Sequence, residues 1–134
     1  MQPAHLPPHR FLVIDDNSVD SILLVEEIRR GRPEAVIDTA RTAEEGLLKV
    51  RKKAYDLVLC DFKLPGISGL AFMKLSLELQ PNTPVILLTT QSTEESEQDS
   101  YKGAYGFLRK PVRAEILHRV IHSALAGQRR IRFE

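Results

Sequence analysis

Residues 11–16 read FLVIDD, which is four apolar residues followed at once by two aspartates. A mainly apolar segment at residues 55–60 ends in the same way at Asp61, and the segment at 85–88 ends at Thr89. Short apolar runs of this kind are typical of strands that are buried on both faces of a parallel sheet. Each run therefore predicts a central strand with a polar residue at its carboxyl end.

Segments with helical signals separate these strands. Asn17 and Ser18 predict the cap of a first helix, which Gly31 and Pro33 are expected to end. Residues three and four positions apart share one face of a helix. The apolar face of this helix is therefore predicted to contain Val19, Ile22, Leu23 and Ile28.

The rest of the chain continues the alternation. Further strands are predicted at residues 35–40 and 106–109, and further helices at 42–54, 70–79 and 116–125. Between residues 91 and 102 only Tyr101 offers appreciable apolar surface, so a fourth helix there is predicted to be short, mobile or partly unwound. The alternation implies right-handed crossovers and one α/β domain, in which helices cover both faces of a parallel sheet.

Composition narrows the class of protein. The chain has 134 residues, of which 43% are hydrophobic, and this suffices for the core of one domain. Nineteen basic residues nearly balance eighteen acidic ones, which argues against direct binding of nucleic acid through a general charge footprint. No apolar stretch is long enough for a bilayer, and residues 1–10 lack the apolar centre of a signal peptide. No membrane association is therefore expected, and the predicted location is cytoplasmic.

The polar residues at the strand ends are expected to meet. The carboxyl ends of parallel strands open onto one crevice, so the side chains that follow them should share a pocket. These residues are Asp15, Asp16, Asp61, Thr89 and Lys110. Carboxylates are the ligands that Mg2+ prefers, whereas ammonium and hydroxyl groups donate well to phosphoryl oxygens. The sequence therefore predicts a site for Mg2+ and a phosphoryl group.

The order of these residues resembles the receiver domain of two-component response regulators. The resemblance is carried by Asp15-Asp16, by Asp61 followed by Leu64-Pro65 and Gly69, by Thr89, and by Lys110-Pro111. It covers about residues 11–126 and leaves residues 1–10 as a flexible leader and residues 127–134 as a basic tail. It implies a flavodoxin-like, doubly wound, five-stranded parallel sheet in strand order 2-1-3-4-5, and a cis peptide before Pro111.

The resemblance also implies a role for each residue of the predicted pocket. Asp61 would accept the phosphoryl group, and Lys110 and Thr89 would bind the phosphoryl oxygens. The Mg2+ ligands would be Asp15, Asp16, Asp61 and the backbone carbonyl of Lys63.

Further residues are interpreted as a switch and as a rim. Phe107 matches the aromatic residue whose ring turns inward in receiver domains when the threonine, here Thr89, moves toward the phosphoryl group. Lys63 and Gln91 are interpreted as rim residues that set how fast water reaches phosphorylated Asp61. Both roles are hypotheses that kinetic measurements can test.

The expected function is that of a stand-alone, single-domain response regulator. It would take a phosphoryl group from a sensor histidine kinase or a histidine phosphotransfer protein and then switch its binding to a downstream protein, with a homodimer as one allowed state. It would not be an enzyme beyond the self-catalysed phosphorylation and dephosphorylation of Asp61.

Other classes of protein stay open. One is the N-terminal regulatory fragment of a larger transcription factor or enzyme. Another is a small phosphatase that forms an aspartyl phosphate, although such enzymes place a second acid where this chain has Lys63. A flavin-binding module of similar topology is disfavoured, because no hydroxyl-rich phosphate loop follows the first strand.

Overall fold

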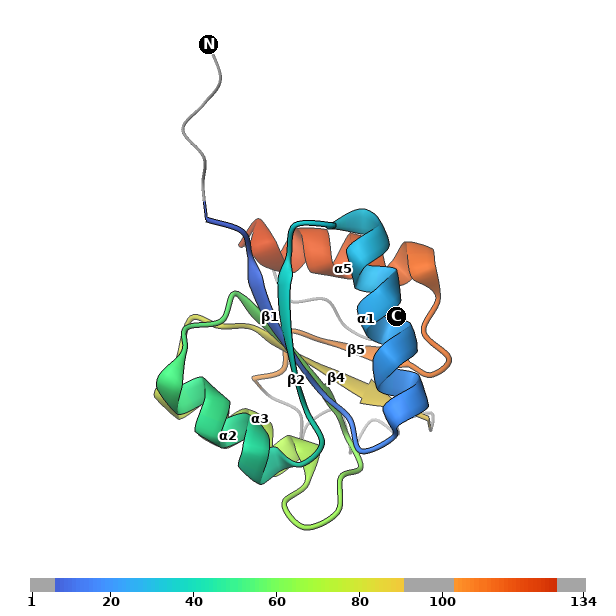
Figure 1. Ribbon diagram of the computed structural model, residues 1–134. Coiled ribbons are helices and arrows are strands. Elements are labelled where there is room, and N and C mark those ends of the chain that lie inside the picture. The colour runs from blue at the N-terminus through green and yellow to red at the C-terminus, as the bar shows by residue number, and fades with distance from the viewer. Residues whose placement is uncertain (1–6, 91–102, 128–134) are drawn as a thin grey trace.

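A parallel β-sheet forms the middle layer of the molecule, whose computed structural model describes residues 7–90 and 103–127 (Figure 1). Within these ranges the sheet contains five strands in the order β2-β1-β3-β4-β5, and every neighbouring pair is parallel. The strands are β1 (Arg10–Ile14), β2 (Val36–Ala40), β3 (Leu57–Asp61), β4 (Val85–Thr89) and β5 (Gly106–Arg109). The predicted α/β class and the flavodoxin-like strand order are confirmed.

Helices cover both faces of this sheet. α1 (Ser18–Gly31) and α5 (Ala114–Leu125) lie on one face, and α2 (Ala43–Lys52) and α3 (Gly69–Leu79) lie on the other (Figure 1). The predicted fourth helix falls on residues 91–102, which lie outside the described residues. None of the helices in the described ranges combines the length and the apolar character that crossing a membrane requires.

Side chains of the central strands alternate between the two helical layers. In β1, Leu12 and Ile14 belong to the core beneath α2 and α3, whereas Phe11 and Val13 belong to the core beneath α1 and α5. All four side chains are fully buried. Successive side chains of a strand point to opposite faces, so a strand that is covered on both sides needs an apolar residue at each position. This explains the unbroken apolar run that begins at Phe11.

The apolar face predicted for the first helix is largely wrong. Val19, Ile22 and Leu23 are 62%, 57% and 58% exposed. α1 packs on the sheet through Leu24 and Ile28 instead. The apolar residues of this helix lie on more than one side, so periodicity alone allows more than one buried face. Contact with the sheet selects the face that contains Leu24.

The boundaries of the other elements agree with prediction to within two residues, which is the usual uncertainty at element ends. β1 begins at Arg10, one residue inside the predicted leader. The predicted N-terminal cap of the first helix is present, and α2 has a side-chain cap as well. The side chain of Asn17 accepts a hydrogen bond from the amide of Asp20 at 3.0 Å, and Thr42 accepts one from the amide of Glu45 at 3.1 Å.

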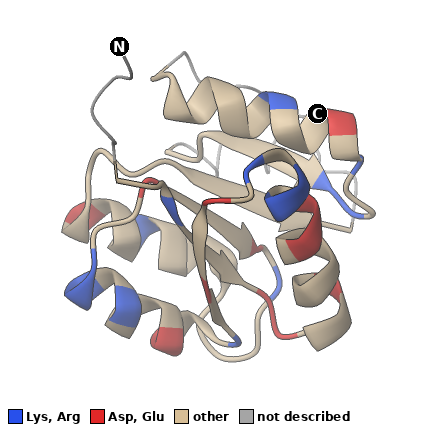
Figure 2. Cartoon of the chain, turned by 45° about the horizontal axis from the view of Figure 1, so that its top comes forward, with Lys and Arg blue, Asp and Glu red and all other residues tan. Residues whose placement is uncertain are grey.

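Acidic and basic residues occur on the same helices, as Figure 2 shows. α1 has Asp20 in its first turn and Arg29 and Arg30 in its last turn, and α2 follows the same order of charge. This order is favourable because the helix dipole places partial positive charge at the N-terminus and partial negative charge at the C-terminus.

Candidate functional site

The predicted acidic residues meet at the carboxyl ends of β1 and β3. Asp15 and Asp16 follow β1, and the amide of Asp15 donates to the carbonyl of Ala40 at 3.0 Å, which continues the pairing of β1 with β2. Asp61 is the last residue of β3. Asp15 is 1% exposed and Asp61 is 9% exposed, whereas Asp16 is open to solvent. The fold therefore brings together acidic residues that are far apart along the chain.

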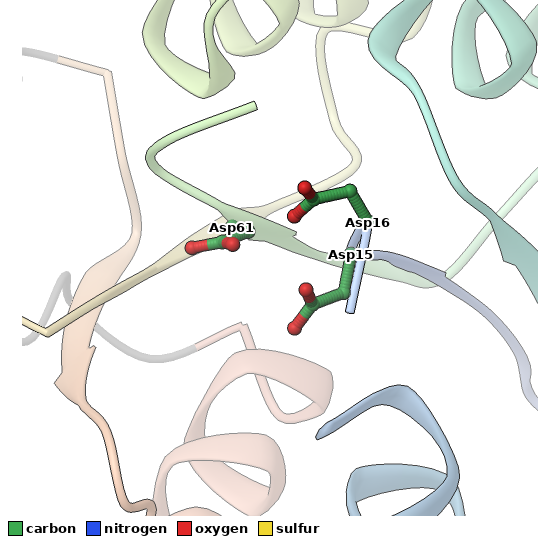
Figure 3. Close-up of side chains that lie close together, drawn as sticks. All are labelled: Asp15, Asp16 and Asp61. Atoms are coloured by element: carbon green, nitrogen blue, oxygen red, sulfur yellow. The ribbon is translucent and has the colours of Figure 1, made fainter. Parts of the chain in front are cut away.

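The three carboxyl groups lie side by side (Figure 3). One oxygen from each of Asp15, Asp16 and Asp61 lies within 4.8 Å of the corresponding oxygens of the other two. Carboxylates this close repel one another, and a divalent cation among them would remove that repulsion. Mg2+ takes oxygen ligands in an octahedral arrangement and keeps several waters, so a donor set of a few carboxylates fits this ion.

Burial raises the pKa of Asp61, because it disfavours the charged form. The ammonium of Lys110 opposes this effect, whereas the carboxylates of Asp15 and Asp16 add to it, and the net result is a pKa above the ordinary value. The carboxylate of Asp61 is therefore an energetically costly charge in the absence of a cation.

Lys110 brings a positive charge to this acidic cluster. Its Nζ donates hydrogen bonds to Oδ2 of Asp15 at 2.7 Å and to Oδ2 of Asp20 at 3.1 Å, and it lies 3.4 Å from Oδ2 of Asp61. Partial burial lowers the pKa of Lys110, but the hydrogen bond to Asp15 and the charges of Asp61 and Asp15 outweigh burial, so the pKa is raised. Lys110 is therefore held in its charged form. The peptide between Lys110 and Pro111 is cis, as the resemblance implied.

Gly69, which is part of the predicted motif, packs directly under the site. It is the first residue of α3, and its amide donates to the carbonyl of Phe62 at 3.0 Å. A Cβ atom at this position would collide with the backbone carbonyl of Asp61. Glycine is therefore needed here for close approach of the loop after β3, which positions Asp61.

Thr89 and Phe107 lie on neighbouring strands near the site. Thr89 ends β4 and is 4% exposed, and Phe107 in β5 pairs with Leu87 of β4. Phe107 is 8% exposed and belongs to the core beneath α2 and α3. Leu87 belongs to the same core, and the alternation of side chains along β4 places Thr89 on that face as well. Their predicted action as a switch stays a prediction.

The structure describes only one of the two predicted rim residues. Lys63 is exposed in the loop between β3 and α3, two residues after Asp61. Gln91 lies outside the described residues. The predicted effect of both residues on the loss of phosphate stays a prediction.

Asp20 was absent from the predicted site. The sequence shows only an acidic residue in the first turn of a helix, where acids are favourable for a general reason. Its contact with Lys110 depends on how α1 lies relative to the loop after β5, which no local pattern reveals. The structure therefore adds a fourth carboxylate to the group predicted from the sequence.

Comparison with known proteins gives an independent view of the chain. The family model for the response regulator receiver domain matches residues 11–122. The transcriptional regulatory protein ZraR of Salmonella typhimurium is 33% identical over 119 residues, which cover 88% of this chain and 26% of that protein. The chain spans about a quarter of the length of the curated relatives that it matches in this way.

Solved structures show the same fold over most of their length. A CheY-like receiver domain protein from Methanospirillum hungatei superposes with a TM-score of 0.82 at 27% identity, and the match covers 90% of this chain and 96% of that one. A response regulator from Chloroflexus aurantiacus gives a TM-score of 0.80 at 28% identity, covering 89% of this chain and 98% of that one.

Proposed function

The chain belongs to the response regulator receiver domain family, and on this premise we propose that Asp61 accepts a phosphoryl group from a phosphohistidine. Receiver domains interact with histidine kinases or phosphotransfer proteins and bind Mg2+ in an acidic pocket. The observation that supports the proposal for this chain is the placement of Asp61 within 4.8 Å of the Asp15 and Asp16 carboxylates and 3.4 Å from the ammonium of Lys110.

The proposed reaction transfers a phosphoryl group between two side chains. A carboxylate oxygen of Asp61 forms a bond to phosphorus while the bond between phosphorus and the donor imidazole nitrogen breaks. The imidazole keeps the electron pair of that bond and takes up a proton. The product is an aspartyl phosphate on this chain and a neutral histidine on the donor.

The difficulty of this reaction is repulsion between two negatively charged reactants. A bound Mg2+ would supply positive charge to the phosphoryl oxygens and to the carboxylate at once. We propose Asp15, Asp16, Asp61 and the backbone carbonyl of Lys63 as the groups that hold it. Lys110 would stabilise a phosphoryl oxygen as a point charge, and its raised pKa supports this role because the side chain stays protonated at neutral pH.

The proposed response to phosphorylation is a shift between two packings. The hydroxyl of Thr89 would donate to a phosphoryl oxygen and so move toward Asp61. Phe107 lies next to Leu87 on the neighbouring strand and on the same face as Thr89, which supports a role for its ring in this shift. The exposed Lys63 and also Gln91 are proposed to limit the access of water to the phosphoryl group.

The partners and the setting belong to the same proposal. The donor would be a sensor histidine kinase or a histidine phosphotransfer protein in the cytoplasm, and the output would be a changed affinity for a downstream protein or for a second copy of this chain. The chain would catalyse only its own phosphorylation and dephosphorylation. One role is a stand-alone regulator. The other is the regulatory part of a larger transcriptional regulator, which is favoured by the short share of ZraR that the chain spans. The length of the native reading frame separates the two roles.

The proposal is tested by intact mass spectrometry after incubation with Mg2+ and phosphoramidate. We expect the native chain to gain one phosphoryl group and Asp61→Asn to gain none. Glu78→Gln is a matched control, because it also removes one carboxylate but lies exposed on α3. A gain of mass in Asp61→Asn, or no gain in the native chain, would show the assignment to be wrong. Steady turnover of a small phosphomonoester would favour the phosphatase class instead.

A further inference from the structure

The two shortest contacts of Lys110 are not with the proposed phosphoacceptor. An ammonium group has three donors. Those of Lys110 reach Asp15 at 2.7 Å and Asp20 at 3.1 Å, and Asp61 is farther away at 3.4 Å. Asp15 is nearly fully buried behind the lysine, whereas the side chain of Asp20 is 43% exposed at the mouth of the site. Lys110 is therefore held on its outer side by a carboxylate that is not one of the proposed Mg2+ ligands.

The carboxylate of Asp20 bonds to Lys110 and not to the first turn of its own helix. It is the third residue of α1, a position from which an acidic side chain often reaches back to the amide of the capping residue. Here the amide of that residue, Asn17, donates instead to Oδ1 of Asp15 at 2.9 Å. The Asp20 carboxylate points to Lys110, so its contact is a long-range one and not part of the helix cap.

We propose that Asp20 is a positioning residue that restrains Lys110 on the side of α1 in the unphosphorylated protein. In this proposal, Lys110 turns toward Asp61 and gives up its bond to Asp20 when it binds a phosphoryl oxygen. This inference rests on the proposed function of Asp61 and adds a residue that acts through Lys110 without touching the reacting atoms.

Two physical effects of Asp20 change the rate of phosphorylation in the same direction. Its bond to Lys110 stabilises the state without phosphate and is lost as the phosphoryl group arrives. Its negative charge near Lys110 also repels the incoming phosphoryl group, because like charges repel one another. Both effects slow phosphorylation. Removal of the Asp20 charge therefore releases Lys110 and accelerates transfer at a saturating concentration of donor.

The first part of the test does not depend on phosphorylation. In protein labelled at the lysine Cε and Nζ atoms, the NMR signal of Lys110 should shift in Asp20→Asn. Glu26→Gln is the matched control, because Glu26 is exposed, lines the same cleft between α1 and Pro111, and has no hydrogen bond or ion pair with Lys110 in the described part of the chain. An unchanged Lys110 signal in Asp20→Asn, or an equal shift in Glu26→Gln, would show that no specific pair exists.

The second part measures the rate of phosphorylation against phosphoramidate concentration, with Mg2+ present, by quenched mass spectrometry. We expect Asp20→Asn to raise the saturating rate about threefold to fivefold, which corresponds to the loss of one partly exposed ion pair. Asp20→Glu, which keeps the charge within reach of Lys110, should stay close to the native rate. Glu26→Gln should leave the saturating rate unchanged.

The outcomes separate this inference from the proposed function. If the native chain gains no phosphoryl group while the Lys110 signal shifts as expected, the function assigned to Asp61 is wrong, and so is the effect of the pair on transfer. If the native chain is phosphorylated and Asp20→Asn is no faster, or Glu26→Gln is equally fast, only the role of Asp20 is wrong. A rise caused by Asp20→Asn that persists unchanged in Lys110→Ala would also overturn that role, because Asp20 would then not act through the lysine.

Discussion

Nζ of Lys110 lies 2.7 Å from Oδ2 of Asp15, and this ion pair joins the loop after β5 to the end of β1. The Asp15 side chain is 1% exposed and that of Lys110 is 13% exposed. Both charges are largely removed from water, so neither is stable there without the other. Removal of one partner alone would therefore leave an uncompensated buried charge and destabilise the fold.

Replacing Lys110 should destabilise the protein in the absence of Mg2+. Lys110→Ala leaves the buried carboxylate of Asp15 without its cation, next to Asp16 and Asp61. We expect a loss of roughly 3 kcal/mol in the free energy of unfolding, the usual result of breaking a buried pair. Urea denaturation in EDTA measures this loss. Lys74→Ala, at an exposed position of α3, should change the same quantity by less than about 0.5 kcal/mol.

Asp61→Asn should have the opposite effect on stability, and the effect should depend on pH. The folded protein binds the Asp61 proton more tightly than the unfolded chain does, because burial raises the pKa. Ionisation of Asp61 therefore costs stability as the pH rises from the ordinary pKa of 3.8 through the raised value. At neutral pH without metal, Asp61→Asn should be more stable by about 1 kcal/mol, because the neutral amide avoids the cost of burying a charge and of placing it beside Asp15 and Asp16.

The pH series gives this prediction its control. Below the ordinary pKa, Asp61 is protonated in both states, and the difference between Asp61→Asn and the native chain should nearly vanish. Denaturation curves at a series of pH values, with Glu78→Gln as a charge-matched reference, measure the difference. A gap that is equally large in acid would mean that the ionisation of Asp61 is not its source.

Added Mg2+ should stabilise the native chain and remove the cost of the carboxylate cluster. At a free concentration 100 times its Kd, a ligand that binds only the folded state adds about 2.7 kcal/mol to the free energy of unfolding. Asp16→Ala removes an exposed carboxylate of the cluster and should weaken this stabilisation. Thermal unfolding with increasing Mg2+ measures both. An equal rise of the Tm with Na+ at matched ionic strength would indicate screening and not a bound ion.

Gly69→Ala should disturb the site through the backbone. The added Cβ would collide with the carbonyl of Asp61, which is backbone and cannot move aside as a flexible side chain can. We expect a loss of about 1–3 kcal/mol in the free energy of unfolding, the cost of overpacking, together with slower phosphorylation of Asp61. Ala71→Gly, on the same helix, adds no atoms and should affect stability only through helix propensity, by about 1 kcal/mol or less, with no change in phosphorylation.

The strands and the acidic cluster could be predicted because their signals are local. A strand that is covered on both faces needs a continuous apolar run, as at Phe11, and the polar residue that ends such a run lies at the carboxyl edge of the sheet. The buried face of the first helix could not be predicted in this way. Val19, Ile22 and Leu23 form an acceptable apolar face in the sequence, but the sheet contacts Leu24 and Ile28.

The sequence by itself determined the alternation of strands and helices and the residues that could meet at the ends of β1, β3, β4 and β5. Both follow from the period of the apolar residues and from the geometry common to parallel sheets. Only the tertiary structure decided which side of α1 is buried and that Asp20 reaches Lys110. Both depend on where α1 lies across the sheet relative to the loop after β5, and that position is set by packing between distant segments, which a local pattern does not encode.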